Sequence, residues 1–456
     1  MIPKSPCTIA ARILRLSTVL LFLGGMAMPA FAEVPRFTEF GGEVTRTASA
    51  VGEGQLAVLH HPSRLLVGDA PRDVRFATSM AVVHASVADI EATVLGFDQY
   101  AEFVPQAKEV KLRGQSLGEY LVDYTLEFEL PIRNLTLDYI LHYKRESDGS
   151  IRWDLIRGDF EGTSGRWEFF ALDENRTFVV YTAWSDLDSM GFTMRLMLRA
   201  QSDLRVALPV VNTSIVLEAV RRRAEGRPAE DSAPSKVSRT QPTVPLVSSA
   251  GQADRLEAVR ALAHAGTVLM IYPRQWIMTS EGPLDLIFVG AVVLVDSPII
   301  KTRHYAQQFP RYGEFFDQIR KATMTEAEDE TLVNWSLGLG FGFLSVRLDY
   351  TLGYTRDTNP NVLAFTSKHG DFEHVYGAWE WIPLDDSQSL VAYTTVSESG
   401  ANAPAILRLQ ELLPNRKVTV GVATAGVVAE NIGPWIEGQP DISDAKVERG
   451  AVVPEP

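Results

Sequence analysis

Phe97-Asp98-Gln99-Tyr100-Ala101-Glu102-Phe103 is the stretch that decides the fold, because it returns as Phe309-Pro310-Arg311-Tyr312-Gly313-Glu314-Phe315. A second motif repeats in the same way: Gly158-Asp159-Phe160 with Gly165-x-Trp167-Glu168 returns as Gly370-Asp371-Phe372 with Gly377-x-Trp379-Glu380. The offset is 212 residues in both cases. A recurrence of this length is domain-sized, so the sequence predicts two copies of one fold.

The first 32 residues have the features of a secretory signal peptide. Basic residues precede an apolar run, Leu16 to Met28, and Ala30-Phe31-Ala32 forms a small-residue cleavage pattern before Glu33. The alternative is an uncleaved anchor, but the run is shorter than the ~20 residues that a membrane span needs. We therefore expect export across the inner membrane, probable cleavage aside, into the periplasm.

Composition divides the rest of the chain. A stretch rich in Pro, Ser, Ala and Gly, residues 225–251, predicts a linker. It separates a first domain, residues 33–224, from a second, residues 252–438, and a flexible tail is expected at 439–456.

Charge argues against two classes of partner. Removal of Lys4, Arg12 and Arg15 with the signal peptide leaves 40 basic against 57 acidic residues, a net charge of −17. Nucleic acids and anionic membrane surfaces are therefore unfavoured, although transient membrane contact stays open. The run Arg221-Arg222-Arg223 is expected in the last turn of a helix, where cations complement the helix dipole. The single cysteine, Cys7, lies in the signal peptide.

Alternation of apolar and polar residues predicts antiparallel strands with one covered face. The apolar positions of one strand in each copy are Tyr124, Leu126, Phe128, Leu130 and Ile132, and Trp335, Leu337, Leu339, Phe341 and Phe343. A long helix is expected to close the first copy, whereas the Gly- and Val-rich stretch Val418 to Val428 predicts a helix less strongly in the second. The fold class is thus α+β, a curved antiparallel sheet covered by a C-terminal helix in each copy.

These motifs resemble the START-related helix-grip superfamily (SRPBCC), in particular its polyketide cyclase and coenzyme-Q-binding branch. The resemblance rests on the helical segment Ala88 to Leu95, the Phe97 to Pro105 segment, the later Gly-x-Trp strand and the terminal helix. It covers about Val74 to Arg223 and about Leu284 to Asn431, the second match being weaker at its start. The superfamily shares one shape among many functions.

The resemblance implies an apolar cavity between sheet and helix, for a lipid, sterol, quinone or polycyclic aromatic ligand. The candidate cavity residues are Tyr124, Phe128, Tyr139, Tyr143, Trp153 and Trp167 in the first copy, and Trp335, Phe341, Tyr350, Tyr354, Phe365 and Trp379 in the second. Where the copies differ, as at Tyr124/Trp335 and Trp153/Phe365, the two cavities are expected to accept different ligands.

No catalytic or metal-binding constellation repeats. None of the histidines recurs at the same position in the other copy, and His369-x-Asp371-x-x-His374 has no counterpart. Asp159 and Asp371 are expected to bond backbone amides in turns. Glu168 and Glu380 would enter a cavity only if the preceding Trp pointed outward. The sequence therefore assigns no catalytic residue, metal or cofactor.

Three functions remain open. The first is an exported carrier or binding protein for apolar small molecules or lipids, without covalent chemistry. The alternative is an aromatase or cyclase of the polyketide type, in which cavity shape and a few polar groups would suffice. In the third, the second copy is a scaffold without a cavity, as its Gly-rich strand and weaker terminal helix suggest. The sequence does not determine the oligomeric state.

Overall fold

The computed structural model describes residues 33–67, 70–128, 135–200, 204–228, 237, 241–249, 253–341, 344–356, 358–399 and 416–442. The predicted signal peptide, most of the predicted linker and residues 443–456 of the tail lie outside the described residues.

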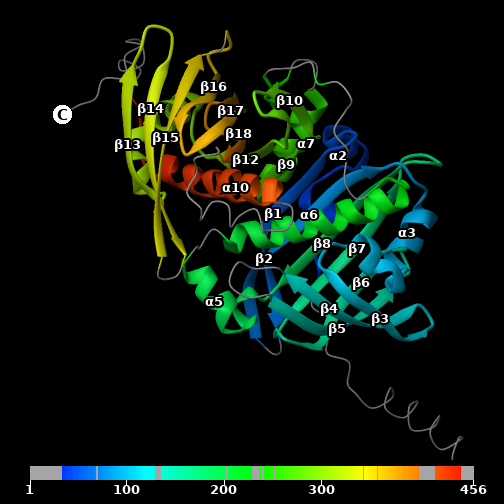
Figure 1. The fold of residues 1–456 in the computed structure, drawn as a ribbon. Helices are drawn as coiled ribbons and strands as arrows, with labels where there is room; N and C mark the ends of the chain where they lie inside the picture. The colour runs from blue at the N-terminus through cyan, green and yellow to red at the C-terminus, as the bar shows by residue number, and fades with distance from the viewer. Residues whose placement is uncertain are drawn as a thin grey trace, which may run out of the picture.

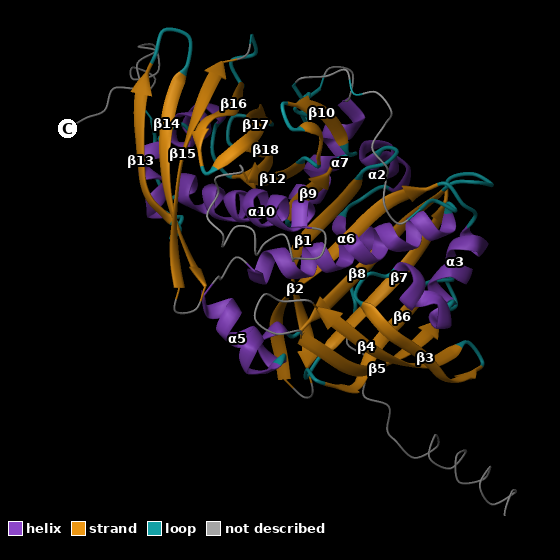
Figure 2. Cartoon of the chain, viewed as in Figure 1, coloured by secondary structure: helices purple, strands orange, loops and turns teal. Residues whose placement is uncertain are grey.

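Each copy begins with a helix and two central strands, continues through short helices into six strands, and ends in a long helix (Figures 1 and 2). The first copy consists of η1 (Phe37–Phe40), α2 (Val44–Val51), β1 (Leu56–Val67), β2 (Ala70–Val83), α3 (Val87–Leu95), η2 (Phe97–Gln99), α4 (Tyr100–Phe103), β3 (Ala107–Ser116), β4 (Glu119–Phe128), β5 (Leu135–Arg145), β6 (Ile151–Gly158), β7 (Thr163–Ala171), β8 (Thr177–Ser185), η3 (Leu187–Ser189), α5 (Gly191–Ala200) and α6 (Leu204–Ala224).

The second copy follows the same order, with one added hairpin. It consists of α7 (Ala253–Ala263), β9 (Thr267–Ile271), β10 (Gln275–Thr279), β11 (Gly282–Leu286), β12 (Val289–Val295), α8 (Ile299–Ala306), η4 (Phe309–Glu314), β13 (Ile319–Glu326), β14 (Thr331–Phe341), β15 (Leu344–Arg356), β16 (Val362–Gly370), β17 (Phe372–Pro383), β18 (Ser389–Ser399) and α10 (Arg416–Glu437).

The strands of both copies form one sheet. Its sixteen strands run in the order β13-β14-β15-β16-β17-β18-β12-β9-β1-β2-β8-β7-β6-β5-β4-β3, and β10 pairs with β11 separately. The first half of the order repeats the second half in reverse, so each copy contributes an equivalent eight-stranded antiparallel sheet. The predicted tandem helix-grip fold is therefore confirmed.

A pseudo-two-fold axis relates the copies at the β1–β9 junction. Ala57 pairs with Met270 and Val58 pairs with Leu269. Under the 212-residue offset, Ala57 corresponds to Leu269 and Val58 corresponds to Met270. Each residue thus pairs with the counterpart of its own neighbour, which is the pairing that a symmetric homodimer would form across a two-fold axis.

Helices α6 and α10 lie side by side on one face of this sheet (Figure 1). The former packs on β1, β2 and β8, and the latter on β9, β12 and β18. One apolar core beneath them contains residues of both copies, including Val58 and Leu217 from the first and Leu269 and Val422 from the second. On the other face, α2 and α7 cover a second shared core with Leu59 and Met270.

A polar contact also joins the copies. Glu430 on α10 accepts hydrogen bonds from His60 Nδ1 at 2.6 Å and from Arg75 at 3.1 Å. Burial raises the pKa of Glu430, but the bond from His60 and the charges of His60 and Arg75 outweigh burial, so the pKa is lowered overall. Glu430 therefore stays ionised between the two copies.

The weaker helix expected in the second copy is wrong, because α10 spans 22 residues. Gly and β-branched residues lower intrinsic helix propensity, but burial of an apolar face outweighs it. Here the small residues serve close packing: a Cβ at Gly421 would lie 2.5 Å from Val289. The expectation of one buried strand from Leu284 to Val295 is also wrong, because β11 ends at Leu286 and β12 begins at Val289 in a different sheet.

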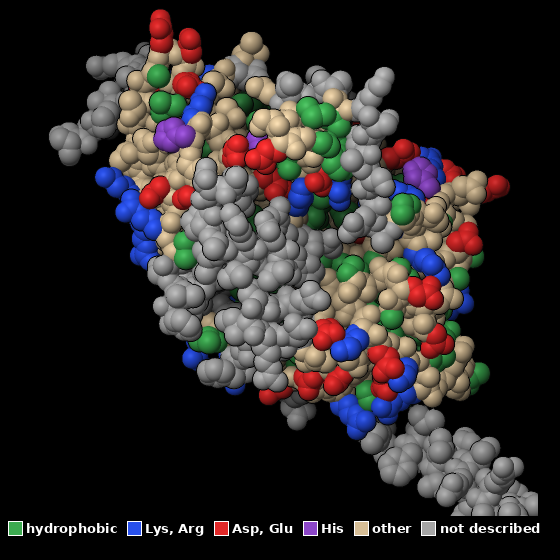
Figure 3. All heavy atoms as spheres, viewed as in Figure 1, with side chains coloured by type: hydrophobic (Ala, Val, Ile, Leu, Met, Phe, Trp, Pro, Cys, Tyr) green, Lys and Arg blue, Asp and Glu red, His purple; other side chains and the backbone are tan. Residues whose placement is uncertain are grey.

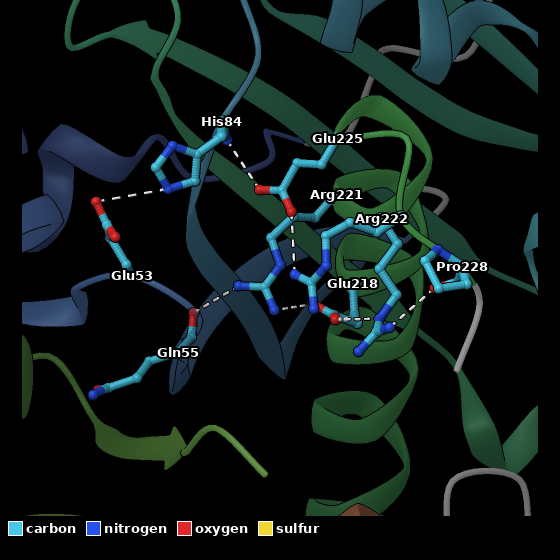
Figure 4. Close-up of polar contacts among 9 residues, drawn as sticks. Glu53, Gln55, His84, Glu218, Arg221, Arg222, Glu225 and Pro228 are labelled. Atoms are coloured by element: carbon cyan, nitrogen blue, oxygen red, sulfur yellow. Dashed lines mark hydrogen bonds and ion pairs between the residues drawn. The ribbon is translucent and has the colours of Figure 1, made fainter. Parts of the chain in front are cut away.

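The three consecutive arginines lie in the last turn of α6, as predicted (Figure 4). Arg221 pairs with Glu218 and donates to the carbonyl of Gln55 at 3.3 Å, and Arg222 donates to Glu218 at 2.7 Å. These pairings tie the end of the helix to itself and to the start of β1. On the face drawn in Figure 3, acidic and basic side chains of the first copy are interspersed rather than separated by sign.

Candidate functional site

The first copy contains a cavity of about 240 Å³ between its sheet and helix α6. The sheet contributes Tyr124 and Tyr139 from β4 and β5, and α6 contributes Val211 and Ile215. Leu187, Met190 and Met194, from η3 to α5, line it near the start of α6. Thr419, which belongs to α10 of the second copy, also lines it. The cavity therefore has a wall that spans both copies.

Five predicted residues of the first copy line this cavity: Tyr124, Tyr139, Tyr143, Trp153 and Trp167. Five of the second copy, Trp335, Tyr350, Tyr354, Phe365 and Trp379, belong to or pack against its separate core. Phe128 and Phe341 end β4 and β14, but their side chains lie outside the described residues. The structure thus gathers the candidates by copy, and their part in binding a ligand stays a prediction.

The tyrosines of the cavity are held by one another. The hydroxyls of Tyr124 and Tyr143 lie 2.8 Å apart in a hydrogen bond. The ring of Tyr124 stacks on Tyr139 with centroids 5.2 Å apart, and Trp167 stacks on Tyr181 with centroids 4.0 Å apart. Burial raises the pKa of Tyr124 and of Tyr143 well above the ordinary value for tyrosine. The hydroxyls stay neutral, so they can donate hydrogen bonds but cannot act as phenolate bases near neutral pH.

Aromatic rings fill the corresponding region of the second copy. Tyr312 lies 5.5 Å from Trp335 and 6.4 Å from Phe316, between ring centroids. Phe316 stands where the first copy has Val104, and Trp435 stands where it has Arg223. Both Trp435 and Arg223 donate to the equivalent glutamate, Glu314 and Glu102 respectively. The two interiors therefore share a frame but differ in how rings fill them.

The repeated carboxylates do not face the cavity. Asp159 accepts from the amide of Asp138 and Asp371 from that of Asp349, both at 2.7 Å, so their predicted bonding to backbone amides is confirmed. Each amide lies on a neighbouring strand rather than in the same turn. Both aspartates thus fasten one strand to the next.

Glu168 and Glu380 lie on the opposite side of the sheet from the tryptophans that precede them. Glu168 accepts from the amide of Phe37 at 3.0 Å, and Glu380 accepts from that of Val247 at 2.7 Å. Val247 is buried, so this end of the predicted linker packs against the second copy. The glutamates anchor the segment that precedes each copy.

Asp154 has the most clearly perturbed carboxyl group of the first copy, since burial raises its pKa to about 6 despite the nearby charges of Arg152 and Arg166. A raised pKa is typical of catalytic acids, but structural ion pairs produce it too. Asp154 neighbours Trp153 in β6, so its side chain points to the opposite face of the sheet from the cavity. It cannot reach a ligand there.

Gly165 makes room for Trp153. The two residues are paired across β6 and β7, and a Cβ at Gly165 would lie 2.4 Å from the Trp153 ring and 2.6 Å from the carbonyl oxygen of Thr182. The second copy repeats the arrangement, since a Cβ at Gly377 would lie 2.1 Å from Phe365. The glycine in each Gly-x-Trp motif thus seats the aromatic ring of the next strand.

We expect Gly165→Ala to lower the free energy of unfolding by about 2 kcal/mol, because the ring and the strand must shift to relieve the contact. Urea denaturation would measure the change. Gly114→Ala is the matched control, since no atom lies within 4 Å of a Cβ there. Equal effects of the two substitutions would contradict this account of the motif.

Two kinds of lining residue escaped sequence reasoning. Tyr181 belongs to β8, where eight consecutive residues are buried, so no alternation distinguishes its faces. Thr419 comes from the other copy, and no local pattern indicates a contact at that sequence distance. The repeat offset, applied to Tyr181 and Tyr393, was the one signal that could have found the tyrosine.

Metal and membrane features were also examined in the described part of the chain. No three or more His, Cys, Asp or Glu side chains of the described residues are grouped so that they could hold a metal ion. Among the described helices, none combines the length and the apolar character that crossing a bilayer requires.

Neither a protein-family model nor a curated protein matches this chain. Among solved structures it is similar to the di-domain aromatase/cyclase StfQ from the steffimycin biosynthetic pathway, with 10% identity, 78% of this chain and 98% of that chain covered, and a TM-score of 0.26. It is also similar to the ZhuI aromatase/cyclase from Streptomyces sp. R1128, with 19% identity, coverages of 33% and 94%, and a TM-score of 0.28. A third likeness is to a STAR-related lipid transfer protein fragment from Xanthomonas axonopodis, with 15% identity, coverages of 38% and 94%, and a TM-score of 0.28. TM-scores this low do not support a conclusion on function.

Proposed function

We propose that the protein is an exported carrier or binding protein that holds one neutral, apolar small molecule or lipid in the cavity of its first copy, without covalent chemistry. One observation carries the proposal: none of the described residues that line the cavity is Asp, Glu, His, Lys, Arg or Cys. A charged ligand would find no counter-charge there, and burial of an unpaired charge is costly. Aromatic and aliphatic side chains favour an apolar ligand instead.

The size of the cavity supports a ligand larger than one benzene ring. An engineered apolar cavity of about 150 Å³ binds benzene, and the cavity here has about 240 Å³. Two fused rings, or an alkyl chain of similar bulk, are therefore the natural occupants.

Export belongs to the same proposal and rests on residues 1–32. N-terminal sequencing of protein from its own cells is expected to find a mature start near Glu33. A chain that still begins at Met1 would contradict export by cleavage.

The binding proposal predicts a co-purifying ligand. We expect native mass spectrometry of mature protein from its own cells, followed by organic extraction, to find one apolar molecule per chain. Ala183 is buried and lines the cavity, so Ala183→Leu should fill the space and abolish co-purification. Thr395→Leu, 212 residues later in the second copy, is the matched control and should retain the ligand.

Two results would overturn the proposal. Ligand that persists in Ala183→Leu but disappears in Thr395→Leu would move the binding site to the second copy. Turnover of a soluble polyketide analogue by the mature protein, abolished by one polar substitution in the cavity, would favour the aromatase or cyclase alternative instead.

A further inference from the structure

Trp153 carries a hydrogen-bond donor in the cavity that no protein group uses. The side chain lines the cavity and is only 5% exposed. Its indole nitrogen Nε1 is buried and has no hydrogen-bond partner among the described residues. A buried donor without an acceptor is unfavourable, so the site favours an occupant that brings an acceptor atom.

Other indoles are unpartnered too, but they are elsewhere. Trp335, Trp379 and Trp381 also have a buried Nε1 without a partner among the described residues, and all three belong to the second copy. Trp153 alone of these four lines the described cavity of the first copy. Its unmet donor is therefore the one that a ligand in this cavity can reach.

A second donor lies beside the first. Tyr143 is paired directly with Trp153 across β5 and β6, and their ring centroids are 6.3 Å apart. Tyr143 shares a hydrogen bond with Tyr124. Two hydroxyls joined by one hydrogen bond use one of their two hydrogens, so the other remains for an acceptor. The pair and the indole thus form a donor group on one wall of an otherwise apolar cavity.

The second copy removes the indole donor but keeps the frame. Phe365 replaces Trp153, and it is paired with Tyr354 and Gly377 as Trp153 is paired with Tyr143 and Gly165. The indole is therefore not required by the fold at this position, since a phenyl ring satisfies the same strand pairing.

We propose that the cavity of the first copy selects apolar ligands that carry a carbonyl oxygen, with Trp153 Nε1 and the Tyr124–Tyr143 hydroxyl pair as its donors. This inference rests on the proposed binding function and narrows it to ketone- or quinone-like molecules. An ordered water is the competing occupant of the donors, and it would give no preference for a carbonyl.

The test compares tetralin with 1-tetralone, which have the same fused-ring skeleton and differ by one ketone. Isothermal titration calorimetry on the full mature chain is expected to show about tenfold tighter binding of 1-tetralone. Trp153→Phe, which installs the second copy's residue, should reduce that preference to about twofold or less and leave tetralin affinity unchanged. Trp184→Phe removes another cavity-lining indole and should keep the preference.

The outcomes separate the two proposals. Equal affinities of the wild-type protein for tetralin and 1-tetralone would overturn the carbonyl preference and leave the binding function standing. Binding of neither molecule would contradict the binding function itself. Loss of both ligands in Trp153→Phe would show that the indole only shapes the cavity.

A spectroscopic measurement does not depend on any variant. In wild-type protein with 15N-labelled tryptophan, 1-tetralone is expected to move one indole N–H proton resonance downfield, as a new hydrogen bond does, and tetralin is not. Identical shifts with both molecules would overturn the proposal even if Trp153→Phe failed to fold.

Discussion

Residues 33–224, expressed without the second copy, are expected not to form a folded monomer. Their removal from the full chain exposes the edge of β1, which pairs with β9 over five residues. It also strips the first core of Leu269, Ile271, Val289 and Val422. Burial of one such side chain contributes about 1.5–3 kcal/mol, whereas a whole domain is stable by only about 5–15 kcal/mol. Loss of several therefore removes most of the stability.

Size-exclusion chromatography with light scattering, together with a circular dichroism melt, would measure the effect. The matched control is the full chain with a protease site placed between residues 229 and 236 and then cleaved. Both halves should stay associated and elute as the intact protein does, because the sheet and cores rather than the linker hold them. A half-chain that is monomeric and melts near the temperature of the full chain would refute the prediction.

This prediction changes how the scaffold hypothesis can be tested. Deletion of the second copy would abolish binding whichever copy holds the ligand, because it removes Thr419 from the cavity wall and uncovers the shared core. Point substitutions at equivalent positions, such as Ala183 and Thr395, separate the copies where deletion cannot.

Stability is expected to fall by about 3 kcal/mol between pH 6.5 and pH 4 because of His61. Burial lowers the pKa of this side chain to about 4; the nearby charges of His60 and Arg75 lower it further, against an opposing hydrogen bond with the backbone of Pro62. Its Nε2 lies 3.1 Å from Thr78 Oγ1, and its ring lies between Phe40 and Phe76. A protonated imidazole is poorly accommodated there.

The direction follows from proton linkage. The unfolded chain, with an ordinary histidine pKa of about 6.5, binds the proton more tightly than the folded chain. The stabilisation is therefore present in full above pH 6.5, decreases as the pH falls, and levels off below pH 4. The size follows from about 1.4 kcal/mol for each pKa unit.

Urea unfolding at a series of pH values would test this expectation. His61→Gln keeps a hydrogen-bonding group for Thr78 but does not titrate, so the difference in stability between wild type and variant should shrink or reverse toward pH 4. His84→Gln is the control, because its side chain is 48% exposed. A wild-type minus His61→Gln difference that is constant with pH would rule out His61 as the cause.

The sequence by itself determined the repeat, the α+β class and the covered face of each sheet. Motifs 212 residues apart revealed two copies, and alternation along a strand indicated which side chains point inward, because successive residues of a strand face opposite sides. That rule placed Tyr124 and Trp167 inside, and correctly left Glu168 on the other face.

Tertiary structure alone decided how the copies join and where the cavity lies. The pairing of β1 with β9 depends on two edges that are far apart in sequence and have no mutual local signal. The Gly- and Val-rich α10 is a full helix because packing on β12 and β18 outweighs its weak intrinsic propensity. Thr419 reaches the cavity of the first copy for the same reason. Local patterns fix which face of an element is buried, but the burial partner is set by the free energy of the whole packed core.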